Sequence, residues 1–112
     1  MNTSVYYLYR DASNYKKANR VILKGELTEE QKSEILAKRS EGLWFIPRQV
    51  GLPENRFEEV TEDDHCWFEL EDDGIDTTDE APTESITAEE FAKNFLEVKS
   101  WDELAWTLGG VA

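Results

Sequence analysis

Alternating apolar and polar residues predict two strands near the N-terminus. The segment Ser4–Arg10 is rich in aromatic and β-branched residues, as strands are. The segment Arg20–Leu27 alternates in the same way, and turn-forming residues lie at 11–14 between the two. We therefore expect an antiparallel hairpin with a long connection that carries three basic residues, Lys16, Lys17 and Arg20.

Helical spacing and capping sequences predict three helices. Thr28-Glu-Glu-Gln31 fits a capping box, in which the Thr hydroxyl and the Gln side chain bond each other's backbone donors, and predicts a helix to about Arg39. A second box at Thr87-Ala-Glu-Glu90 opens a helix with a buried stripe formed by Ala88, Phe91, Ala92, Phe95 and Leu96. A third, Ser100-Trp-Asp-Glu103, predicts a short helix ending at Gly109-Gly110.

Short strands and loops complete the predicted fold. Leu43–Ile46 and His65–Leu70 are expected to be strands, and Gln49–Pro53 a loop. The acidic segment at about 71–85 contains Gly and Pro and few apolar residues, so we expect a loop there. The sum is a single α+β domain over residues 1–112, with a small antiparallel sheet of three to five strands packed by two or three helices.

Composition fits one small globular domain. The chain has 112 residues, of which 39% are hydrophobic, and its four Trp, four Tyr and five Phe argue against a disordered chain. The sequence has no run of about 18 apolar residues, the length needed to span a bilayer, and its N-terminus shows no secretory signal. A single cysteine cannot form an internal disulfide, so we expect a reducing, cytoplasmic setting.

Charge is distributed unevenly along the chain. The net charge of −13 disfavours direct binding to nucleic acid or to an anionic membrane. Up to residue 50 there are nine Lys and Arg against six Asp and Glu, but afterwards three against nineteen. This asymmetry predicts a partner-binding acidic patch, whose members are Glu58, Glu59, Glu62, Asp63, Asp64, Glu71, Asp72, Asp73, Asp76, Asp79 and Glu80.

Two interpretations of this acidic patch remain open. Carboxylates could take the place of nucleic-acid phosphates and bind a basic groove, with the same release of counterions. They could equally form a solvated surface that serves only to keep the protein soluble, as charge runs often do.

The acidic segment also matches part of a calcium-binding loop. Counted from Glu69, the EF-hand pattern is met by Gly74 at position 6 and by Glu80 at position 12. The first position lacks the expected Asp, a strand is predicted before the loop, and Pro82 follows it. We predict no specific metal site and no cofactor, and the weak candidates for non-specific divalent binding are Glu69, Glu71, Asp73 and Glu80.

His65 and Cys66 are adjacent, and each is the only residue of its type. In a strand their side chains would point to opposite faces, and no second His or Cys could complete a zinc site. The first interpretation places Cys66 and Phe68 in the core, with His65, Trp67 and Glu69 on the other face. The alternative places Trp67 inside and leaves Cys66 exposed. Neither predicts a catalytic residue, so we expect a protein that is not an enzyme.

Four segments resemble, as a set, a family of short uncharacterised bacterial or phage-borne proteins. They are Tyr6-Tyr-Leu-Tyr-Arg-Asp-Ala-Ser-Asn-Tyr-Lys16, Gly25-Glu-Leu-Thr-Glu-Glu-Gln31, Phe45-Ile-Pro-Arg-Gln-Val-Gly-Leu-Pro53 and Thr61-Glu-Asp-Asp-His-Cys-Trp67. The resemblance covers most of the chain to about Leu70. It implies a free-standing protein of bacterial or phage origin, and it transfers no functional residue because the family has no established activity.

The sequence thus predicts a non-enzymatic, acidic interaction protein that binds a basic protein surface, such as that of a nucleic-acid-binding protein. A concrete form is an inhibitor of a nucleic-acid-handling defence complex, of the anti-CRISPR or anti-restriction type, acting by nucleic-acid mimicry. The alternative is a small bacterial housekeeping or regulatory domain whose acidity only serves solubility. Oligomeric state is not predicted.

Overall fold

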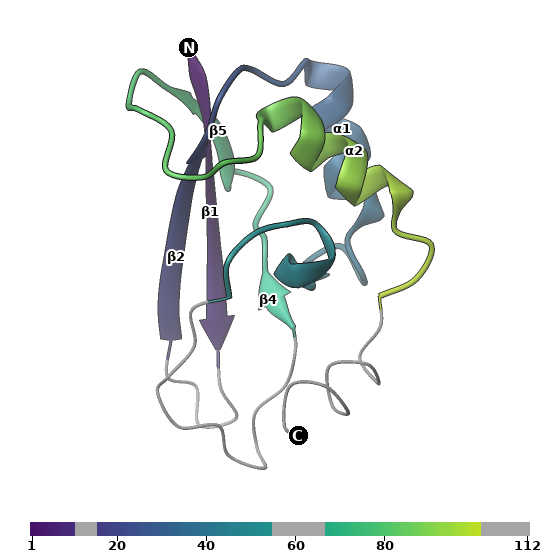
Figure 1. The fold of residues 1–112 in the computed structure, drawn as a ribbon. Coiled ribbons are helices and arrows are strands. Elements are labelled where there is room, and N and C mark those ends of the chain that lie inside the picture. Colours follow the sequence, from purple (N-terminus) through teal and green to yellow (C-terminus); the bar gives the residue numbers. More distant parts are fainter. Residues whose placement is uncertain (11–15, 55–66, 102–112) are drawn as a thin grey trace.

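A computed structural model describes residues 1–10, 16–54 and 67–101 (Figure 1). The described residues form one five-stranded antiparallel sheet and two α-helices that pack on one face of it. This confirms the predicted α+β class. The opposite face of the sheet, over which no described helix packs, is called the outer face below.

The N-terminal hairpin is confirmed. Strand β1 (Asn2–Arg10) pairs antiparallel with β2 (Lys16–Leu23), from Thr3 opposite Leu23 to Arg10 opposite Lys16. The expected basic connection is wrong, because all three of its basic residues, Lys16, Lys17 and Arg20, lie within β2 and pair with β1. β2 also ends earlier than expected, before Gly25, whose φ of +94° leaves the extended region.

Two short strands extend the sheet on the other side of β1. β3 (Trp44–Phe45) pairs with β4 (Phe68–Glu69), which pairs with β1 through Glu69 opposite Leu8. Both lie within segments predicted to be strands. A single turn of 3-10 helix, η1 (Pro47–Gln49), follows β3, since Pro favours the first position of a helix.

The acidic segment is not the loop that its sequence predicts. Within it, β5 (Ile75–Thr78) pairs antiparallel with β1, from Asn2 opposite Thr78 to Val5 opposite Ile75. Residues 79–83 then leave the β5 side of β1 and reach the outer edge of β2, where Thr83 bonds Ile22. A strand forms here despite the polar sequence because β1 satisfies its backbone groups and only Ile75 is buried.

The two described helices begin as predicted. α1 (Glu29–Lys38) and α2 (Ala88–Glu97) each have a complete capping box, on Thr28 and Thr87 respectively. Four of the five residues of the predicted stripe on α2 are buried, and Leu96 is half-buried. The third predicted capping box extends past residue 101, outside the described residues.

The core lies between the sheet and the helices. β1 contributes Val5, Tyr7 and Tyr9 to it, and α2 contributes Phe91 and Phe95. Aromatic rings dominate the contacts: Tyr7 lies edge-on to Phe45 of β3 at 5.5 Å between ring centroids. This packing fixes β1, and through it the strands on both of its sides.

Candidate functional site

Six exposed carboxylates follow one another on the segment that contains β5. We call this set the acidic ridge: Glu71, Asp72, Asp73, Asp76, Asp79 and Glu80. All six were predicted members of the acidic patch. The other five predicted members, Glu58, Glu59, Glu62, Asp63 and Asp64, lie outside the described residues. The ridge is therefore the part of the predicted patch whose geometry is defined.

A tight turn holds the first half of the ridge against the sheet. The Gly74 N–H donates to the Glu71 carbonyl at 3.0 Å, and the Tyr6 N–H of β1 donates to the Gly74 carbonyl at 2.8 Å. A Cβ at position 74 would lie 2.7 Å from the Tyr6 carbonyl oxygen, which is closer than real Cβ contacts come. Glycine thus permits the close approach that anchors the turn.

Arg39, at the end of α1, clamps the same turn. Its guanidinium donates to the Leu70 carbonyl at 2.5 Å and to the Asp72 carboxylate at 2.7 Å, and its Nε donates to the Leu36 carbonyl at 2.7 Å. The Arg39 side chain is 7% exposed, whereas that of Asp72 is 86% exposed. Asp72 is therefore a member of an ion pair that fixes the turn, and it presents little uncompensated charge.

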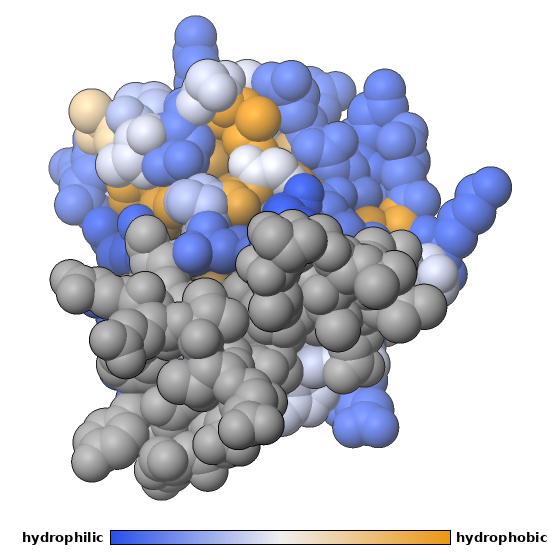
Figure 2. Space-filling model, turned by 60° about the horizontal axis from the view of Figure 1, so that its bottom comes forward, coloured by the Kyte–Doolittle hydropathy of each residue, from blue (hydrophilic) through white to orange (hydrophobic). Residues whose placement is uncertain are grey.

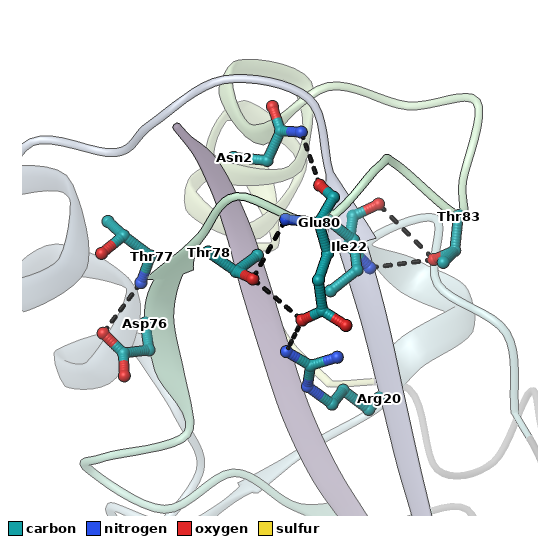
Figure 3. Close-up of polar contacts among 8 residues, drawn as sticks. All are labelled: Asn2, Arg20, Ile22, Asp76, Thr77, Thr78, Glu80 and Thr83. Atoms are coloured by element: carbon teal, nitrogen blue, oxygen red, sulfur yellow. Dashed lines mark hydrogen bonds and ion pairs between the residues drawn. The ribbon is translucent and has the colours of Figure 1, made fainter.

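Glu80 ends the ridge in a polar network on the outer face (Figure 3). Its carboxylate accepts hydrogen bonds from Arg20 of β2 at 2.5 Å and from the Thr78 hydroxyl at 2.8 Å. Its backbone carbonyl accepts a bond from the Asn2 side chain at 2.8 Å. The bonds from Arg20 and then Thr78 hold the pKa of Glu80 below its ordinary value. Glu80 thus joins residues 79–83 to β1 and β2, which is a structural role.

The remaining four carboxylates are different. Among the described residues, Glu71, Asp73, Asp76 and Asp79 form no ion pair. Asp76 accepts a bond from the N–H of Thr77, the next residue of β5, at 2.8 Å. These four, called the open carboxylates below, keep their charge exposed on a backbone that the surrounding contacts hold in place.

The calcium-loop interpretation fails on geometry. Glu69 is only 5% exposed and its carboxylate accepts bonds from Arg10 at 2.8 and 3.4 Å. Glu80 is held by Arg20, and β5 lies between the two. Within the described ranges, no group of three or more His, Cys, Asp or Glu could hold a metal ion. The weak metal candidates Glu69, Glu71, Asp73 and Glu80 are therefore not brought together.

The positions of Phe68 and Glu69 show which face of β4 packs against the core. Phe68 is fully buried in the core, as predicted, and Glu69 lies opposite Leu8 and Trp44, which places it on the outer face. The ion pair with Arg10 explains why this carboxylate is buried there. His65 and Cys66 lie outside the described residues.

One shallow depression, of about 330 Å³, lies beside the end of α2. The residues that line it are Gln49, Asn94, Glu97, Val98 and Lys99. The Asn94 amide donates to the Val50 carbonyl at 3.1 Å and the Gln49 amide to the Ser100 carbonyl at 3.2 Å, so both amides tie the chain together. The depression offers Glu97 and Lys99 as its charged groups, one of each sign.

The buried tyrosine at the centre of the sheet has a structural role. The Tyr7 hydroxyl donates to the Pro53 carbonyl at 2.6 Å. Burial, with a smaller effect of Glu84 and Glu54, raises the pKa of Tyr7 well above its usual range. The hydroxyl therefore stays protonated and fixes the loop after η1.

The coloured part of the surface in Figure 2 is mostly hydrophilic, with patches of apolar surface between charged and polar residues. No helix in the described part of the chain is long and apolar enough to cross a membrane. Comparison with protein-family models, curated proteins and solved structures finds no match to this chain.

Proposed function

We propose that this protein is a non-enzymatic interaction protein, and that its open carboxylates bind a basic surface of a partner protein. The observation that supports this most is the contrast within the ridge. Asp72 and Glu80 compensate Arg39 and Arg20, whereas Glu71, Asp73, Asp76 and Asp79 remain exposed and form no ion pair with a described residue.

Rigidity strengthens this interpretation. A binding segment that is already ordered loses less conformational entropy on association than a flexible one. The β5 ladder, the approach of Gly74 to Tyr6 and the Arg39 clamp all hold the backbone between residues 70 and 80. The open carboxylates are thus presented by a fixed scaffold, in contrast to the loop predicted from sequence.

The partner we propose is a protein that handles nucleic acid in a defence complex, of the CRISPR or restriction type. Such proteins have basic grooves for phosphates, and carboxylates that occupy a groove release its counterions as phosphates do. Inhibition of this kind occupies a surface and needs no reactive group. The uneven charge of the chain would also speed encounter with a basic partner at low salt.

A charge-matched pair of variants tests the proposal. The ridge variant carries Glu71→Gln, Asp73→Asn, Asp76→Asn and Asp79→Asn. The control variant neutralises four exposed carboxylates elsewhere, by Glu34→Gln, Glu41→Gln, Glu89→Gln and Glu97→Gln. Both change the net charge equally. The assay measures inhibition of DNA cleavage by a panel of purified CRISPR effectors and restriction enzymes, at two salt concentrations.

We expect the wild type and the control variant to inhibit at least one member of the panel, and the ridge variant to inhibit it about 10- to 50-fold less strongly. Inhibition by the wild type should weaken steeply as salt rises. Equal inhibition by both variants would contradict the role of the ridge. No inhibition by the wild type would favour the alternative, a housekeeping or regulatory domain whose acidity serves solubility.

A further inference from the structure

The outer edge of β2 is covered by another segment at one end of the strand and left open at the other. β2 pairs only with β1 in the described part of the chain, so its other side forms one edge of the sheet (Figure 1). Near the end of the strand, residues 83–88 cover this edge. The Ile22 N–H donates to the Thr83 hydroxyl at 2.8 Å, and the Thr83 N–H donates to the Ile22 carbonyl at 2.9 Å (Figure 3).

The bonds of Ile22 fix the direction of every backbone group in the strand. Since its N–H and carbonyl point away from β1, the alternation along a strand points those of Lys16, Ala18 and Arg20 away as well. No hydrogen bond from a described residue meets these outward groups. The side chains of all three are exposed. We call this half of the strand the open edge.

An open edge binds another strand, because its unpaired donors and acceptors form a template. Charge decides which strand fits. Lys16 and Arg20 share the outer face with Ala18, and Lys17 is exposed beside them. A second copy of the same edge would place cations against cations, which destabilises a pairing. An acidic segment would instead place carboxylates opposite Lys16 and Arg20.

We propose that the open edge of β2 binds an extended acidic segment of a partner protein by β-strand addition. The partner's carboxylates stand four residues apart, one opposite Lys16 and one opposite Arg20. An apolar residue midway between them lies opposite Ala18. The Arg20 guanidinium bonds Glu80 through one of its nitrogens, which leaves further donors for a second carboxylate. This surface has the opposite charge to the ridge and is independent of it.

The probe is the seven-residue peptide acetyl-Thr-Glu-Thr-Val-Thr-Glu-Thr-amide, followed by NMR. At a peptide concentration of ten times the Kd, we expect amide hydrogen exchange at Ala18 and Arg20 to slow about tenfold. Exchange at Val21, which already lies on the β1 side of the ladder, should not change. Peptide binding without slower exchange at Ala18 and Arg20 would overturn the proposal, as would the absence of any binding.

Two variants at one position test the outward N–H itself. Ala18→Pro removes that donor but no hydrogen bond to β1, and Ala18→Thr keeps the donor in a residue that favours strands. We expect the Pro variant to bind the peptide at least tenfold more weakly than the Thr variant. Equal affinities would overturn the proposal. If the Pro variant fails to fold, the exchange pattern of the wild type decides.

The charge requirement is tested with a peptide in which Lys replaces both Glu residues. It should bind at least tenfold more weakly, and equal binding would overturn the choice of an acidic partner. The ridge variant should bind the acidic peptide no more weakly than the wild type, so failure here is distinguishable from failure of the proposed ridge function.

Discussion

β2 and β5 lie on opposite sides of β1 and are stabilised in different ways. β2 has eight residues and buries Val21, Ile22 and Leu23, whereas β5 has four and buries only Ile75. β5 relies instead on backbone pairing and on polar anchors at both ends, the Arg39 clamp and the Glu80 network. A strand held by its backbone leaves its polar side chains available. Of the ridge residues, Asp76 lies in β5 itself, and the other five lie just before and just after it.

The largest expected effect comes from truncating the apolar anchor of β2. Leu23 is fully buried, and Leu23→Ala should lower the free energy of unfolding by about 3 kcal/mol, because it leaves a cavity beneath the hairpin. Ile75→Ala in β5 should cost less, about 2 kcal/mol, since Ile75 lies at the start of its strand. Urea unfolding of both variants measures the difference. Equal losses would mean that β5 depends on apolar burial as much as β2 does.

At the turn before β5 we expect a loss of unfolding free energy smaller than that of Leu23→Ala. Gly74→Ala should cost about 2 kcal/mol, because the new methyl group would meet the Tyr6 carbonyl and the Leu70 side chain. Gly42→Ala is the matched control, since Gly42 has a φ of +75° and no atom lies within 4 Å of where its Cβ would be. It should cost about 1 kcal/mol from backbone strain alone. Thermal and urea unfolding measure both losses. A larger loss for Gly42→Ala than for Gly74→Ala would contradict the role of Gly74 in anchoring the turn.

The Arg39 clamp should rank third. Arg39→Met removes the donors to the Leu36 and Leu70 carbonyls and should cost about 1.5 kcal/mol. Asp72→Asn removes only the exposed half of an ion pair and should cost less than about 0.5 kcal/mol. If the two variants unfold at the same urea concentration, the clamp acts through its charge and not through the backbone.

The smallest effect is expected from Glu80 and depends on pH. Because Arg20 and Thr78 lower its pKa in the folded state, ionised Glu80 stabilises the fold above the pKa of the unfolded chain. That contribution is lost as the pH falls through the lowered pKa. The unfolding free energy of Glu80→Gln should therefore fall less between pH 6 and pH 3 than that of the wild type. Glu34→Gln serves as the control and should follow the wild type.

Local signals predicted most of the helical structure. Each capping box is complete within four residues, so Thr28 and Thr87 could be identified without knowledge of the fold. The hairpin was predicted for a similar reason, since both of its strands carry the alternation that one buried face requires. Its exact extent was not, because Lys16 and Lys17 belong to the ladder only through their partners on β1.

The missed features depend on contacts between distant segments. β5 has a polar sequence, and its pairing with β1 joins residues 70 to 76 positions apart. The ion pairs of Arg10 with Glu69 and of Arg20 with Glu80 also join distant residues, 59 and 60 positions apart. The sequence identified the ridge carboxylates as a group, but only the ion pairs of Asp72 with Arg39 and of Glu80 with Arg20 separate the compensated members from the open ones. Face alternation placed Glu69 on the face away from the core in the first interpretation of its strand, but it could not place Glu69 beside Arg10.

The pairing of β1 with β5 also has a consequence in time. A ribosome adds about 5–20 residues per second, so Thr78 follows its partner Asn2 into the growing chain after roughly 4–15 s. Until then β1 can form the hairpin with β2, but its other edge lacks the complete β5 strand. Nascent chains on neighbouring ribosomes could pair through that edge, so the rate of synthesis and access to chaperones should affect the yield of folded protein.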